Sequence, residues 1–148
     1  MDPLIYVGIM TLLPLFELRW SIPFGIYMGA NWMSVSAVAI LANIALGPLV
    51  LLGLYRFLDV ALKVDFMRNF YEKAVLKTQD KAKAYVEKYG FIGLALFVGV
   101  PLPGSGSYTG ALAAFLLGVD FKKFALANLV GVLFAGALIT AISIGLLG

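Results

Sequence analysis

One stretch decides the fold of this chain: Val100-Pro101-Leu102-Pro103-Gly104-Ser105-Gly106-Ser107-Tyr108-Thr109-Gly110. It lies inside an uncharged segment that runs from Tyr89 to Val119, although proline removes a backbone donor and glycine weakens a helix. In lipid, every backbone polar group needs a partner within the protein. Broken backbone at membrane depth therefore persists only where protein covers it or where it lines a cavity. We predict a break between two helices here, and a candidate binding site at the break.

The composition is typical of an integral membrane protein. Of the 148 residues, 62% are hydrophobic and 13% are charged, an apolar share far above that of soluble domains. The net charge of +3 is too small to indicate a nucleic-acid partner. The chain has no cysteine and no histidine, which excludes serine–histidine catalysis and metal binding by thiolate or imidazole. We therefore expect no enzyme activity, no cofactor and no metal site. Leu4–Phe16 lacks a basic start and a cleavage site, so we expect it to be retained.

Two segments fit ordinary membrane spans. A helix needs about 20 apolar residues to cross a hydrocarbon core of about 30 Å. Ala37–Leu54 and Phe124–Leu147 meet this requirement. We predict spans over about residues 36–55 and 121–147.

Two other segments are broken halfway. Gly90–Val100 would rise only about 16 Å as a helix, and Thr109–Gly118 is similarly short. This predicts a re-entrant helical hairpin over about residues 90–118. The N-terminal region has the same outline, with a break from Pro14 to Pro23, and predicts a first hairpin over about residues 4–32.

An internal repeat relates the two halves. At an offset of 85 residues Gly8 meets Gly93, Gly25 meets Gly110, and Leu41-Ala42-Asn43 meets Leu126-Ala127-Asn128. We predict one all-α membrane domain over residues 1–148, with a repeat of hairpin plus span over 1–55 and again over 89–148. One span separates the hairpins, so they enter from opposite faces, as in the inverted repeats of many transporters.

The charges predict the orientation. Basic residues gather in the segment 56–88 and at Lys122 and Lys123. If the chain has two re-entrant hairpins and two spans, both places lie on one face of the membrane. The positive-inside rule makes this face the cytoplasmic one. Both termini are then outside, whereas four full spans would separate the basic connections. An apolar face at helical spacing in segment 56–88, made by Phe57, Val60, Val64, Met67, Phe70 and Ala74, predicts an amphipathic helix on the membrane surface. Alternatively, this helix binds a partner or senses anionic lipid.

Glu17 and Arg19 are the only charges of the first hairpin region, and they lie between Pro14 and Pro23. Charges at bilayer depth are costly, which suggests a purpose. On a regular helix residues two apart do not face each other, but an irregular tip brings them together. Either they form an ion pair that pins the tip, or Arg19 binds an anion with Glu17 as counter-charge or proton carrier.

The second tip predicts an anion site by another route. The helix after the break presents free N–H groups, which favour negative charge. The candidate residues, with Pro23 from the first hairpin, are Pro101, Pro103, Gly104, Ser105, Gly106, Ser107 and Thr109. In the alternative reading, their hydroxyls only satisfy backbone groups freed at the break. Asn43 and Asn128, polar residues within the spans, are expected to hydrogen-bond between helices rather than touch substrate.

The motifs ELRWSIPFGI (Glu17–Ile26) and PLPGSGSYTGALAAFLLG (Pro101–Gly118) resemble the small multidrug export protein family of prokaryotes. That family is distantly similar to the DedA superfamily of paired re-entrant hairpins, whose members are linked to moving phosphorylated lipid carriers. By this resemblance, Glu17, Arg19, Pro101, Pro103 and Gly104 match the family motifs. The second hairpin departs from the DedA pattern because it has no arginine.

These features together predict a small transporter or lipid translocase of the cell membrane. Its site would lie at the midplane between the hairpins, and its substrate would be anionic and similar to a lipid phosphate. Glu17 would couple transport to protons. One alternative is a proton-coupled exporter of cationic drugs, and another is a membrane scaffold or assembly factor that transports nothing. The expected partners are membrane lipid, the substrate and a second copy in a homodimer, with no nucleic acid.

Overall fold

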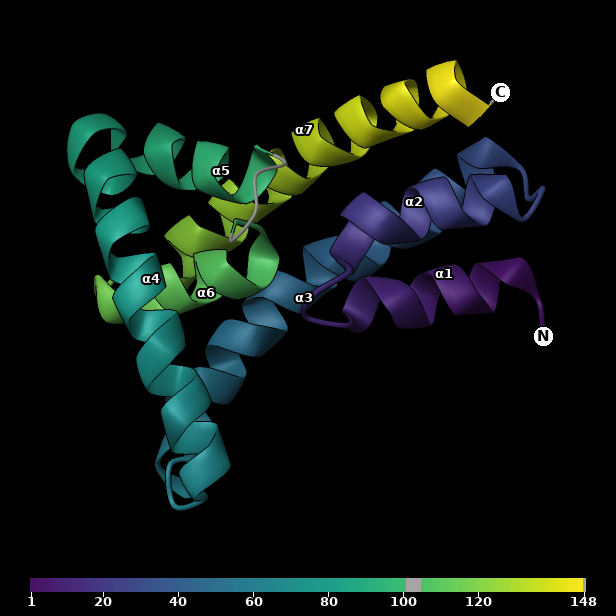
Figure 1. Cartoon of the computed structure of the whole chain (residues 1–148). Coiled ribbons are helices and arrows are strands. Elements are labelled where there is room, and N and C mark those ends of the chain that lie inside the picture. The colour runs from purple at the N-terminus through teal and green to yellow at the C-terminus, as the bar shows by residue number, and fades with distance from the viewer. Residues whose placement is uncertain (101–104, 148) are drawn as a thin grey trace.

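The computed structural model describes residues 1–100 and 105–147, without the side chains of residues 79–82 and 85. The described residues form helices and no strand, in agreement with the predicted all-α class (Figure 1). In chain order the helices are α1 (Pro3–Leu12), α2 (Glu17–Tyr27), α3 (Trp32–Ala61), α4 (Asp65–Tyr89), α5 (Phe91–Gly99), α6 (Ser107–Leu116) and α7 (Phe121–Leu147).

Two helices, α3 and α7, are long and apolar enough to cross a membrane, with mean hydropathies of 2.3 and 2.4. Both predicted spans are therefore single continuous helices. The 30 residues of α3 correspond to about 45 Å at about 1.5 Å per residue, which exceeds a hydrocarbon core of about 30 Å. The two helices pack closely where Gly136 of α7 leaves room for the side chain of Ile40.

Four helices are short, and they form two pairs. The first pair is α1 and α2, of 10 and 11 residues, and the second is α5 and α6, of 9 and 10 residues. Each helix is about 15 Å long, roughly half of a hydrocarbon core. The start of α2 meets the start of α6, where the N–H of Ser107 lies 3.2 Å from Glu17 Oε2, near the centre of the molecule in Figure 1.

One glycine in each pair allows close packing against a long helix. Gly25 of α2 lies against Val7 of α1 and Val35 of α3, where an added Cβ would be 2.5–2.9 Å from their methyl groups. Gly110 of α6 lies in the same way against Val98 of α5, with Phe124 of α7 beside it. In both pairs, the second helix thus uses a glycine to approach the first helix and the long helix.

The connection to α4 differs from the prediction. The amphipathic helix was expected over residues 56–88, but α3 continues to Ala61 and a turn at residues 62–64 precedes α4. The segment around Arg56 and Asp59 contains no glycine or proline, and charge alone does not end a helix. Arg68 secures the turn, because its Nε and Nη2 each donate to the carbonyl of Leu62 at 3.1 Å. In Figure 1, α4 lies at the end of the molecule opposite both termini.

The first break is also shorter than predicted. It was expected to extend from Pro14 to Pro23, yet α2 begins at Glu17 and continues through Pro23. Pro23 has no backbone N–H, so the helix loses the hydrogen bond to the carbonyl of Arg19. The helix otherwise continues through this position. Leu18 and Ile22 are fully buried and hold this part of α2 in the core.

Candidate functional site

The start of α2 carries an ion pair that contacts the end of α5 and the start of α6. Arg19 Nη1 lies 3.1 Å from Glu17 Oε2, and the two side chains are 15% and 5% exposed. Glu17 has a φ of +46°, the one positive φ among the described residues other than glycine. Such a backbone is strained for a residue with a side chain and often marks a functional position. The prediction that an irregular tip brings Glu17 and Arg19 together is confirmed.

The carboxylate of Glu17 binds the start of α6. The backbone N–H of Ser107 donates to Oε2 and that of Tyr108 donates to Oε1, each at 3.2 Å. Helix N-termini favour negative charge because their first N–H groups have no partner within the helix. The anion-binding geometry predicted at this helix is therefore present, and the anion bound in it is the chain's own carboxylate.

The guanidinium of Arg19 binds the other side of the same break. Its Nη2 donates to the carbonyls of Val98 and Val100 at 3.0 and 3.1 Å, and to Ser105 Oγ at 3.3 Å. Ser105 Oγ itself donates to the Val100 carbonyl at 2.7 Å. These carbonyls end α5, where the helix dipole favours positive charge. The expectation that hydroxyls near the break satisfy freed backbone groups is thus met at Ser105.

Gly106 allows the pair to approach. Its φ is +126°, and an added Cβ would be 2.6 Å from Glu17 Oε2 and 2.7 Å from Arg19 Nη1. Gly106 was predicted to let a ligand approach the backbone, and in the structure the ion pair is the group that lies against it. Thr109 Oγ1 donates to the Gly106 carbonyl at 3.3 Å. Three predicted site residues, Pro101, Pro103 and Gly104, lie outside the described residues.

The two asparagines extend this network. Asn128 Nδ2 donates to the carbonyl of Ile44 at 3.2 Å, and Asn128 Oδ1 accepts from Ser107 Oγ at 2.7 Å. Asn128 therefore joins α7 to α3 and α6, as expected for a polar residue within a span. The side chain of Asn43 in α3 lies close to the carboxylate of Glu17 in α2. Its Oδ1 is buried and has no partner among the described residues. Asn43 was expected to act between helices, and it lies beside the charge of a neighbouring helix.

Tyr108, whose hydroxyl was expected to contribute at the second tip, also contacts the site. Its N–H binds Glu17, its hydroxyl donates to the carbonyl of Leu12 at the end of α1, and its ring faces a pocket. Pro23 lies further along α2, where it removes one backbone donor. The described residues also bring together no cluster of three possible metal ligands.

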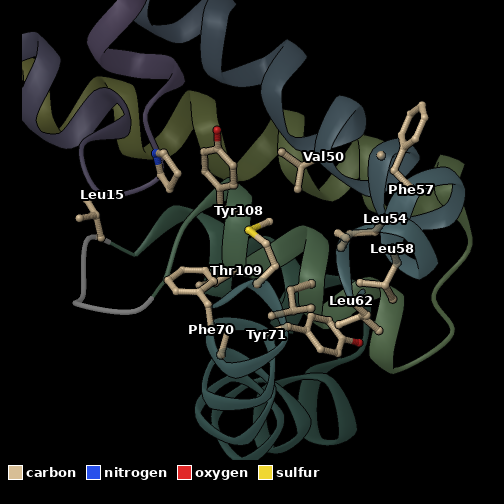
Figure 2. A pocket seen from close by; sticks show the side chains of 16 residues that line it. Leu15, Val50, Leu54, Phe57, Leu58, Leu62, Phe70, Tyr71, Tyr108 and Thr109 are labelled. Atoms are coloured by element: carbon tan, nitrogen blue, oxygen red, sulfur yellow. The ribbon is translucent and has the colours of Figure 1, made fainter. Parts of the chain in front are cut away.

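The pocket has a volume of about 430 Å³ and lies between α3, α4, α6 and the α1–α2 connection (Figure 2). Its wall includes Pro14, Leu54, Leu58, Phe70, Tyr71 and Tyr108. The side chains around it are apolar, apart from the hydroxyls of two tyrosines and Thr109. Partial burial raises the pKa of the Tyr71 hydroxyl, which therefore stays protonated. A pocket of this size and character is typical of small-molecule and lipid sites.

Comparison with known proteins gives one match. A family model described as "Putative small multi-drug export protein" matches residues 17–138, which is most of the chain. The match begins at Glu17 and includes α2 to α6 and most of α7. No curated protein and no solved structure matches the chain.

Proposed function

The chain belongs to the small multi-drug export protein family, and we propose that it is a membrane transporter that binds an anionic substrate between two re-entrant hairpins. The family description suggests export rather than catalysis. The substrate site consists of Arg19, the first N–H groups of α6 and the hydroxyls of Ser105 and Thr109. The substrate resembles a lipid phosphate.

One observation carries the proposal. The carboxylate of Glu17 accepts from Ser107, Tyr108 and Arg19, the donors that a phosphate or carboxylate of a substrate would use. Glu17 therefore stands where the substrate anion would bind. Protonation of Glu17 removes its negative charge and weakens all three contacts. The anion can then take the place of the Glu17 carboxylate, so that a proton and an anion enter together. When Glu17 releases its proton, its carboxylate returns to these donors and expels the anion.

The arrangement of the helices supports re-entrant hairpins. The four short helices are each about half as long as a membrane is thick. The α1–α2 pair extends from the end that holds the termini, and the α5–α6 pair extends from the end that holds α4 (Figure 1). Gly25 and Gly110, which match in the internal repeat, make equivalent contacts. With α4 and Lys122 on the cytoplasmic side, the positive-inside rule is obeyed.

Binding of dodecyl phosphate tests the proposal. The purified chain and its Glu17→Gln variant are titrated at one pH, so that the ligand's own titration cancels, and the rise in melting temperature is measured. Glu17→Gln should bind more tightly than the wild type, because no internal carboxylate competes. Arg19→Gln should bind more weakly. The exposed Glu72→Gln on α4 is the matched control and should behave as the wild type. Equal affinity in the wild type, Glu17→Gln and Arg19→Gln would reject the proposal.

The pocket favours a second candidate, a proton-coupled exporter of lipophilic cations. Tyr108 lines this apolar pocket and also binds Glu17, so a cation in the pocket would lie near one buried carboxylate. Arg19 opposes this function, because it neutralises Glu17. Tetraphenylphosphonium distinguishes the two. If this candidate is right, tetraphenylphosphonium should stabilise the wild type and should not stabilise Glu17→Gln. Under the anion proposal it should stabilise neither protein.

A further inference from the structure

The pocket extends from the hairpin connections towards the α3–α4 turn. Tyr108 and Leu15 line it near the charge pair, and Leu62 and Tyr71 line it near the turn (Figure 2). Gly53 of α3 borders the same space, and a Cβ added there meets nothing within 4 Å. Walls of an empty apolar space lose their dispersion contacts. In a bilayer, the abundant molecule that can restore them is a hydrocarbon chain.

The turn adds a positive charge at that end of the pocket. Arg68 is exposed, and its guanidinium donates twice to the carbonyl of Leu62, which lines the pocket. Lys63 precedes it in the turn and is also exposed. Basic residues close to a membrane surface attract anionic head groups. The pocket is thus apolar along its length and basic at the end where α3 leaves the apolar layer.

We propose that this pocket holds one acyl chain of an anionic phospholipid, with the head group at Arg68 and the chain end at Tyr108. The lipid is a resident partner and not the cargo, so the inference is independent of the transported substrate. Tyr108 connects it to the charge pair, because its ring lines the pocket while its N–H binds Glu17 and its hydroxyl binds Leu12. An acyl chain packed against this ring holds the start of α6 against Glu17.

Filling the pocket with protein tests the inference. Gly53→Leu places a side chain in the open space, and Gly145→Leu on α7 is the matched control, because a Cβ there also meets nothing within 4 Å. Both substitutions raise helix propensity equally. The full chain is reconstituted in nanodiscs of phosphatidylcholine with a minority of phosphatidylglycerol, and retained lipid is counted by native mass spectrometry.

The wild type and Gly145→Leu should retain one phosphatidylglycerol per chain. Gly53→Leu should retain it about tenfold less, the effect of displacing about two buried methylenes. If Gly53→Leu fails to fold, Ala61→Leu, which also fills the pocket, takes its place. Equal retention in the Gly53 and Gly145 variants overturns the proposal. The proposal is also overturned if filling the pocket abolishes binding of tetraphenylphosphonium but leaves lipid retention unchanged.

The head group is tested separately. Arg68→Gln should reduce the preference for phosphatidylglycerol over phosphatidylcholine, whereas Lys123→Gln, which removes an equal charge at the start of α7, should leave it unchanged. Equal retention of the two lipids by the wild type overturns the anionic head group. An equal effect of the two substitutions overturns its position at Arg68.

Discussion

Glu17 and Arg19, two residues apart in α2, bind the opposite ends of the two helices of the other pair. The carboxylate of Glu17 accepts from the first N–H groups of α6, and the guanidinium of Arg19 donates to the last carbonyls of α5. Each charge therefore matches the sign of the helix end that it binds. Since the break between α5 and α6 leaves these groups without helical partners, one ion pair satisfies both sides of it.

This geometry has two consequences for function. As a structural element, the pair joins the two hairpins and compensates a break that would be costly in lipid. Under the proposed function, it is also an anion-binding position that an internal carboxylate fills. The two roles are compatible, because the contacts that join the two helix pairs are the contacts that a substrate would have to replace.

The first prediction concerns the energetic coupling of the pair. Removing one charge of a buried pair leaves the other unpaired, so Glu17→Gln and Arg19→Gln should each lower the free energy of unfolding by about 3 kcal/mol. The double variant should lose clearly less than the sum of the two. Unfolding in detergent followed by circular dichroism measures this. Additive losses would show that the charges do not stabilise each other.

The second prediction concerns Gly106. Gly106→Ala should lower the melting temperature far more than Gly118→Ala. Both glycines have positive φ and strain an alanine, but only at Gly106 does the added Cβ meet the ion pair, at 2.6 and 2.7 Å, whereas at Gly118 it meets nothing within 4 Å. Gly118→Ala therefore measures the strain of a positive φ where no contact opposes the Cβ, whereas Gly106, at φ +126° and ψ −170°, has a backbone that is essentially restricted to glycine. Equal decreases in melting temperature at the two positions would mean that the close contact at Gly106 does not affect stability.

The element types could be predicted from sequence, because they depend on local signals. Runs of apolar residues predicted α3 and α7, and the proline- and glycine-rich stretch predicted the break before α6. The ends were harder to predict. Charge at Arg56 suggested a boundary that α3 passes through, and Pro23 suggested a break that buried neighbours prevent.

Half of the site could be predicted in the same way. Two charges in an apolar hairpin marked Glu17 and Arg19, and the second motif marked Ser105 and Gly106. Free N–H groups after the break were also predicted, but their contact with Glu17 was not, because it joins residues 90 positions apart. The pocket was also missed, because its wall comes from three helices and a connection that approach only in the folded chain.

The third prediction concerns Tyr108. Tyr108→Phe keeps the ring in the pocket and removes the hydroxyl that donates to Leu12, so stability should fall by about 0.5–1.5 kcal/mol. Lipid retention should stay unchanged, since the ring is kept. Tyr27→Phe, at a side chain that is 78% exposed, is the control and should change neither quantity. Loss of lipid retention in Tyr108→Phe would instead assign the hydroxyl to the lipid contact.

The last prediction concerns topology. If α1–α2 and α5–α6 are re-entrant, α4 and the start of α7 lie on one face of the membrane and the N-terminus lies on the other. The chain has no cysteine, so single cysteines at the exposed positions Asp2, Lys73 and Lys122 can be labelled with an impermeant maleimide in intact cells and in inverted vesicles. Lys73→Cys and Lys122→Cys should react from the cytoplasmic face, and Asp2→Cys from the outer face. With four full spans, the single crossing over about residues 89–119 would separate Lys73 from Lys122 and place them on opposite faces. Labelling of those two positions from opposite faces would therefore reject the paired hairpins, while the ion pair between Glu17 and Arg19 would need another explanation.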